Sequence, residues 1–95
     1  MSKRDEYVRK LQEKLGKWNA EIDALAARAA EAKAGARSEY MEQIEALKAK
    51  QAVAREKIEE LQQSGESAWE DLKSGVELAW TALGEAIDSA RSRFK

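Results

Sequence analysis

Apolar residues recur at helical spacing along almost the whole chain, and this periodicity restricts the fold more than any other feature of the sequence. In the last third, Trp69 recurs as Trp80 and Leu72 as Leu83, which is a repeat of eleven residues. Eleven residues make three helical turns, so the apolar stripe runs nearly straight along an α-helix. We therefore expect one amphipathic helix from about residue 67 to 94.

The first two thirds of the chain have a shorter period. From Val8 to Leu61, apolar residues and Gln51 follow one another at steps of three and four, the heptad pattern of coiled coils. Midway, consecutive steps of four form a stutter, which keeps the stripe on one face of a continuous helix. We therefore expect a single helix from about residue 3 to 62. The alternative is a break near residues 33–38, where a glycine lowers the helix propensity.

The composition agrees with a chain built from helices. The 95 residues include no proline and only five glycines, and alanine, glutamate, lysine, leucine and arginine are abundant. Between the two expected helices, a turn over residues 62–67 contains Gly65, which we expect to end the first helix in the left-handed conformation. The fold class is therefore all-α, and residues 1–95 are expected to form one helical domain.

The two expected helices differ in length, and this difference determines how they can pack. In an antiparallel hairpin, a second helix of about 28 residues covers only the later half of a helix of about 60 residues. The core of this hairpin is expected to consist of Tyr40, Ile44, Leu47, Ile58, Leu61, Trp69, Leu72, Val76, Trp80, Leu83, Ile87 and Phe94.

The earlier half of the long helix then keeps an uncovered apolar stripe. This self-association seam consists of Val8, Leu11, Leu15, Trp18, Ile22 and Leu25. Because exposed apolar stripes of this length mark association sites, we expect a second copy to cover it in a dimeric antiparallel coiled-coil bundle. Net charges of +3 over residues 1–17 and −5 over residues 64–90 favour such pairing. If the chain instead breaks near residues 33–38, three segments of similar length form a monomeric three-helix bundle.

The residue types that most catalytic sites use are missing. Histidine and cysteine, which supply most general acid–base and nucleophilic groups at neutral pH, do not occur in the sequence. Di-iron sites in helical bundles use a Glu-x-x-His motif, which the chain lacks. We therefore expect a protein that is not an enzyme, with no catalytic residues, no cofactor and no metal site.

The charge distribution disfavours nucleic acid as a partner. Seventeen lysines and arginines face eighteen aspartates and glutamates, so a net charge of −1 gives no general attraction to a polyanion. The basic residues near the N-terminus are interleaved with acids, and only Tyr7 accompanies them as an aromatic residue. We expect protein partners instead, above all a second copy of the chain.

A membrane surface is the alternative partner. Trp69 and Trp80 lie on the apolar stripe of the last helix, and tryptophan favours the headgroup region of bilayers. The polar side of that helix is acidic, whereas helices that bind anionic lipid carry lysine and arginine there, so bundle core is the favoured interpretation. The N-terminus lacks the apolar core of a signal peptide, and no apolar run approaches a membrane span of about 20 residues, so we expect a cytoplasmic location.

Four stretches carry a resemblance to a known family. They are residues 2–8, 18–23 and 40–44 and, above all, Trp-Glu-Asp-Leu-Lys-Ser-Gly-Val-Glu-Leu-Ala-Trp at residues 69–80. In these stretches the chain resembles small bacterial coiled-coil proteins that are labelled as stress-response or uncharacterised coiled-coil proteins. The resemblance implies no catalytic residue and no cofactor. It implies a non-enzymatic, self-associating coiled-coil protein that acts as a stress-associated scaffold or protein-interaction module.

Overall fold

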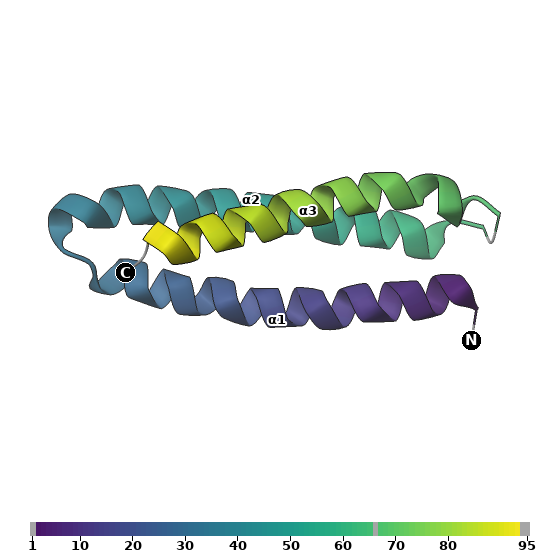
Figure 1. Ribbon diagram of the computed structural model, residues 1–95, viewed down its shortest axis with the longest axis horizontal. Helices are drawn as coiled ribbons and strands as arrows, with labels where there is room; N and C mark the ends of the chain where they lie inside the picture. The colour runs from purple at the N-terminus through teal and green to yellow at the C-terminus, as the bar shows by residue number, and fades with distance from the viewer. Residues whose placement is uncertain (1, 66, 94–95) are drawn as a thin grey trace.

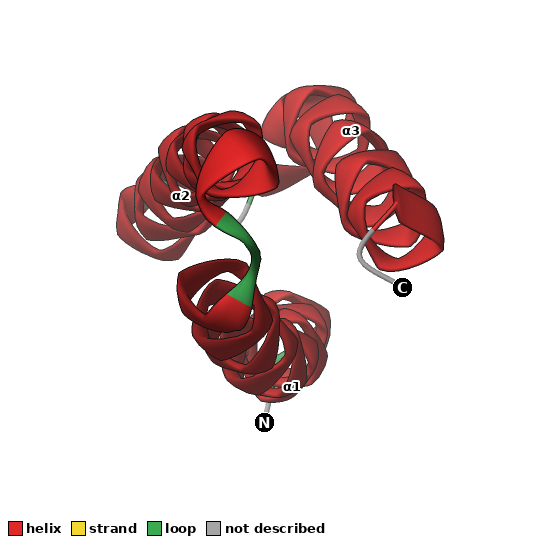
Figure 2. Cartoon of the chain, turned by 90° about the vertical axis from the view of Figure 1, so that its left-hand side faces the viewer, coloured by secondary structure: helices red, strands yellow, loops and turns green. Residues whose placement is uncertain are grey.

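Three α-helices make up the described part of the chain. The computed structural model describes residues 2–65 and 67–93 and contains α1 (Lys3–Glu31), α2 (Ala34–Gln63) and α3 (Trp69–Arg93). The helices run alternately up and down in an elongated bundle of 51 × 19 × 18 Å (Figure 1). Seen from one end, they form a triangle around a common core (Figure 2).

The expected continuous helix over residues 3–62 is wrong, because the chain reverses direction at residues 32–33. Ala32 and Lys33 both have extended backbones, with ψ of 155° and 149°. The Arg37 side chain donates from Nε and Nη2 to the carbonyl oxygen of Ala32, at 3.3 and 3.1 Å. The architecture is therefore the three-helix bundle that was the alternative expectation, and not a hairpin of two helices of unequal length.

The physical reason for the break lies in the burial that it permits. The segment around residues 24–36 is rich in alanine, and alanine side chains bury little apolar surface even in a continuous helix. Reversing the chain there costs a few backbone hydrogen bonds, but it folds the apolar stripe of α1 onto α2 and α3. The break occupies the start of the predicted range 33–38, and Gly35 lies within the first turn of α2.

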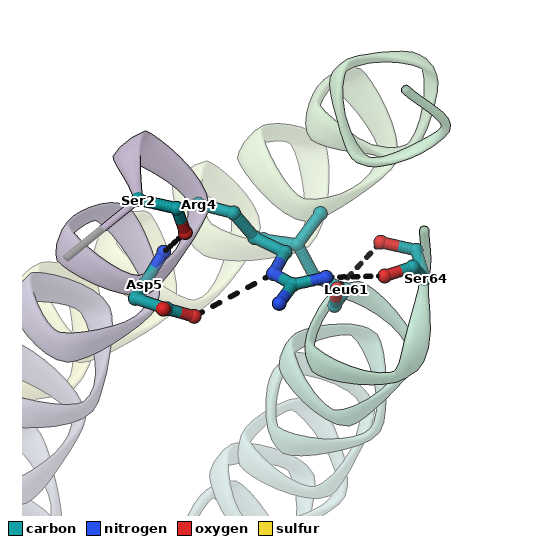
Figure 3. Close-up of polar contacts among 5 residues, drawn as sticks. All are labelled: Ser2, Arg4, Asp5, Leu61 and Ser64. Atoms are coloured by element: carbon teal, nitrogen blue, oxygen red, sulfur yellow. Dashed lines mark hydrogen bonds and ion pairs between the residues drawn. The ribbon is translucent and has the colours of Figure 1, made fainter. Parts of the chain in front are cut away.

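Side chains satisfy backbone groups at the end of the bundle where α1 begins and α2 ends. Ser2 caps α1 by accepting a hydrogen bond from the backbone N–H of Asp5 at 3.2 Å. Arg4 donates from Nη1 to the carbonyl oxygen of Ser64, directly after α2 (Figure 3). A cation at this position also interacts favourably with the partial negative charge of a helix C-terminus. These contacts join the first turn of α1 to the last turn of α2.

The chain leaves α2 differently from the sequence expectation. Ser64 is extended, with φ of −73° and ψ of 153°, and its Oγ donates to the carbonyl oxygen of Leu61 at 2.6 Å. No described glycine has a positive φ, so the predicted left-handed conformation of Gly65 is wrong. The backbone N–H groups of Ala68 and Trp69 donate to the carbonyl oxygen of Gly65, and this turn leads into α3.

The core is a single column of mainly aliphatic side chains between the three helices, with Trp69 as its buried aromatic member. Its members come from the heptad positions of α1 and α2 and from the eleven-residue repeat of α3. The buried apolar residues are Val8, Leu15, Ile22, Leu25, Ala29, Ile44, Leu47, Ala54, Ile58, Leu61, Trp69, Val76, Leu83, Ile87 and Ala90.

Candidate interaction surface

The residues expected to form the exposed self-association seam lie against the core of the chain itself. Val8, Leu15, Ile22 and Leu25 are at most 7 % exposed, and Leu11 and Trp18 are partly buried against them. The prediction assumed that a short second arm would leave this stripe bare. Because α2 and α3 together cover α1, that assumption does not hold.

The expected hairpin-core residues lie mainly between α2 and α3. Ile44, Leu47, Ile58, Leu61, Trp69, Val76, Leu83 and Ile87 are buried, and Tyr40 and Trp80 are partly buried. Leu72 differs, because it is 37 % exposed in the first turn of α3, at the end of the bundle where fewer side chains surround it. Phe94 lies outside the described residues.

Two pairs of aromatic rings join α1 to α3, in addition to an ion pair between Glu21 and Arg91 at 3.5 Å. The rings of Trp18 and Trp80 stack with centroids 4.5 Å apart, and those of Tyr7 and Trp69 lie 5.9 Å apart. The Nζ of Lys14 lies 5.3 Å from the ring centroid of Trp18, within the range of a cation–π interaction. Because both tryptophans of α3 face α1, they contribute to the bundle rather than to a surface prepared for lipid.

The environment of Tyr7 shifts the pKa of its hydroxyl. Burial raises the pKa of the Tyr7 hydroxyl above 10.0, and the nearby charge of Glu77 and a hydrogen bond to it raise that pKa further. The hydroxyl donates to Oε1 of Glu77 at 3.3 Å, and the Nζ of Lys73 lies 5.0 Å from the Tyr7 ring centroid. These contacts join α3 to α1. Because the raised pKa keeps the Tyr7 hydroxyl protonated at neutral pH, this hydroxyl does not act as a base.

A groove between α1 and α2 has a mixed polar lining. It has a volume of about 340 Å³ and is lined by Gln12, Leu15, Gly16, Asn19, Arg55, Ile58, Glu59 and Gln62. Amide and charged groups form hydrogen bonds with water readily, so this groove is well solvated without an occupant.

The groove between α2 and α3 is different because its lining is almost wholly apolar. It has a volume of about 330 Å³, and its lining residues are Ala46, Ala49, Lys50, Val53, Ala79 and Ala82. Val53 is 46 % exposed there, and Leu78, which does not line the groove but lies one helical turn before Ala82 on α3, is 74 % exposed. Apolar surface next to a hollow of this size gains free energy when another apolar surface covers it.

The sequence pattern did not reveal this groove. Val53 and Leu78 fall outside the main apolar stripes of α2 and α3. The sequence feature that could have indicated the groove is a second, weaker apolar stripe on each of these two helices, beside the main one. Its members become one surface only when α2 and α3 lie side by side.

The described residues show neither a metal site nor a membrane span. Within residues 2–65 and 67–93, no three acidic side chains come together in a way that could hold a metal ion. No helix in that part of the chain is both long enough and apolar enough to cross a membrane.

No model of a known protein family matches the chain, and neither a curated protein nor a solved structure matches it.

Proposed function

We propose that the protein is a non-enzymatic helical module that associates with a second copy of itself through the apolar groove between α2 and α3. The observation that carries the proposal is the exposed apolar face formed by Val53, Leu78 and the alanines of the groove. The face has both projecting side chains and a hollow. A self-complementary surface of this kind is what a two-fold symmetric dimer requires.

The surface in this proposal differs from the one expected from the sequence. The seam of α1 is buried within the chain, so association by that route would require the bundle to open. The groove between α2 and α3 is accessible in the folded chain. A module that associates in this way would act as a scaffold, in keeping with the resemblance to stress-associated coiled-coil proteins.

Solution mass measurements test this proposal. Sedimentation equilibrium at micromolar to millimolar concentration should show a reversible dimer of the wild-type chain. Leu78→Lys should shift the protein towards monomer, because a charged side chain replaces the apolar group that projects most from this face. Leu78 is largely exposed, so the bundle should keep its helicity, and its thermal midpoint should match that of the wild type at concentrations low enough for both to be monomeric.

Ala20→Lys provides the matched control. Ala20 is an exposed position of α1 that does not line the groove, and the substitution adds the same charge as Leu78→Lys. This variant should remain as dimeric as the wild type. A wild-type protein that is monomeric at millimolar concentration, or a Leu78→Lys protein that is as dimeric as the wild type, would refute the proposal.

A further inference from the structure

One side of α3, exposed apart from the half-buried Gly75 and Ala86, carries a stripe whose spacing is the same from either end. Its members are Asp71, Gly75, Leu78, Ala82, Ala86, Ser89 and Arg93, separated by steps of four, three, four, four, three and four. Residues at these spacings lie on one face of an α-helix. Ala82 is the centre of the stripe, and it also lines the groove between α2 and α3.

We propose, on the basis of the proposed self-association, that two copies dock with their α3 helices antiparallel and with the two-fold axis at Ala82. In a two-fold interface, a contact from residue i to residue j is repeated from j to i. Each Asp71 then lies opposite Arg93 of the other copy. The occupant of the groove is therefore helix α3 of a second copy of this chain.

Side-chain size along the stripe fits this register. The antiparallel pairing places Leu78, which is 74 % exposed, opposite Ala86 of the other copy, and places Gly75 opposite Ser89. The large side chain meets a small one, and Ala82 meets itself at the axis. Small residues at these positions allow helix axes to approach to about 8 Å, the short end of the usual range.

Charge along the stripe selects the antiparallel orientation. Asp71 and Arg93 each lie eleven residues from Ala82, or about 16 Å along the helix at 1.5 Å per residue. The antiparallel pairing brings the acid of one copy to the base of the other twice. A parallel pairing would place acid opposite acid and base opposite base, which is repulsive. Within the described residues neither Asp71 nor Arg93 forms an ion pair, so both are available to a second copy.

The docked α3 helix of the second copy would contact α2 as well as the stripe of α3, because the groove is lined by both helices. Ala46, Ala49 and Val53 of α2 line it opposite Ala79 and Ala82 of α3. A helix that contacts the stripe of α3 also lies beside these α2 residues. The two α3 helices therefore form the centre of a dimer, with α2 of each copy outside them and α1 remote from the contact.

Charge reversal tests the register. Asp71→Arg and Arg93→Asp should each weaken homodimer formation by roughly tenfold, because each replaces two attractive contacts by two repulsive ones. An equimolar mixture of the two variants should form a heterodimer about as tightly as the wild type, since every contact then joins opposite charges. Native mass spectrometry at low ionic strength distinguishes the heterodimer from both homodimers by mass.

Glu70→Arg is the matched control for Asp71→Arg. It removes an acid from the same first turn of α3 and costs the same helix-dipole interaction, but Glu70 lies outside the stripe. It should leave dimer formation unchanged.

If the single variants dimerise like the wild type, or if their mixture forms no heterodimer, the proposed register is wrong. Self-association through the groove would still stand in that case if Leu78→Lys abolishes the dimer. A wild-type protein that remains monomeric would overturn both proposals.

Discussion

Between α1 and α2 lie aliphatic side chains and one amide pair, whereas aromatic rings, together with an ion pair between Glu21 and Arg91, join α1 to α3. On the α2 side, Nε2 of Gln51 donates to Oδ1 of Asn19 at 2.7 Å, and Gln51 is only 7 % exposed. On the α3 side, Trp18 stacks on Trp80 and Tyr7 lies against Trp69, with all but Trp69 only partly buried.

The two interfaces of α1 therefore differ in how they contribute to the stability of the fold. Interlocked aliphatic side chains exclude water, and the hydrogen bond between the exposed Asn19 and the buried Gln51 forms in only one register. Aromatic rings bridge two helices while their edges stay in contact with solvent, and lysines lie over them. We therefore expect the α1–α2 interface to carry more of the stability and the α1–α3 interface to tolerate more change.

The largest effect should come from truncation in the aliphatic interface. Ile58 is 2 % exposed and lines the α1–α2 groove beside Leu15. Ile58→Ala should lower the free energy of unfolding by about 2–5 kcal/mol, through lost burial and the cavity left behind. Urea denaturation followed by circular dichroism measures this loss. Trp80→Leu should lower the free energy of unfolding by less, because part of the Trp80 ring is already exposed. A larger loss for Trp80→Leu than for Ile58→Ala would contradict the expectation that the α1–α2 interface carries more of the stability.

The amide pair should show its role in a double-mutant cycle. Asn19→Leu removes the acceptor and leaves the buried amide of Gln51 without a partner, at a cost of about 1–3 kcal/mol. Replacing both residues by leucine should be close to neutral, since no polar group is then left unsatisfied. The cycle is read from urea denaturation of the single and double variants. Additive losses would show that the two amides do not act as a pair.

Two glycines test how closely the aromatic interface is packed. A Cβ on Gly16 would meet nothing within 4 Å, so Gly16→Ala should stabilise the protein by up to about 1 kcal/mol through helix propensity. A Cβ on Gly84 would lie 3.2 Å from Cη2 and 3.3 Å from Cζ2 of Trp18, so Gly84→Ala should lose that gain. Thermal denaturation compares the two variants.

Removal of the Trp18 ring gives the control for the glycine experiment. In a Trp18→Leu background, Gly84→Ala should become as stabilising as Gly16→Ala, because the obstructing ring is absent. A Gly84→Ala variant that stabilises the wild-type chain as much as Gly16→Ala would contradict close packing at this position.

The smallest effect should be a pH dependence of the aromatic interface. Because burial, then the charge of Glu77 and its hydrogen bond, raise the pKa of Tyr7 above 10.0 in the folded chain, the unfolded chain loses this proton first as the pH rises. The folded state then binds more protons, so the stability that Tyr7 contributes is full below pH 10 and decreases as the pH rises through the folded-state pKa. The difference in unfolding free energy between wild type and Tyr7→Phe should therefore shrink above that pH. Parallel curves for the two proteins would show that Tyr7 is not coupled to folding.

The structure also shows why the burial of some residues could be predicted from the sequence and the roles of others could not. The core residues of α3 could be predicted because each recurs on one face at a fixed spacing. Gly84 remained unexplained in the sequence, since the reason for it is the ring of Trp18, 66 residues earlier in the chain. The exposed face with Val53 and Leu78 depends on how α2 and α3 lie beside each other, which periodicity within one helix does not specify.

Local spacing and composition were enough to predict that the chain is helical, that most of the apolar stripe faces inward and that a turn lies near Gly65. These properties depend on spacing and propensity within a few helical turns, which are local. The separation of α1 from α2 depends on tertiary contacts. The break at residues 32–33 is favoured by burial of the apolar stripe of α1 against α2 and α3, and not by a local helix breaker. That reversal covered the seam of α1 and left the groove between α2 and α3 as the apolar surface where we propose that a second copy binds.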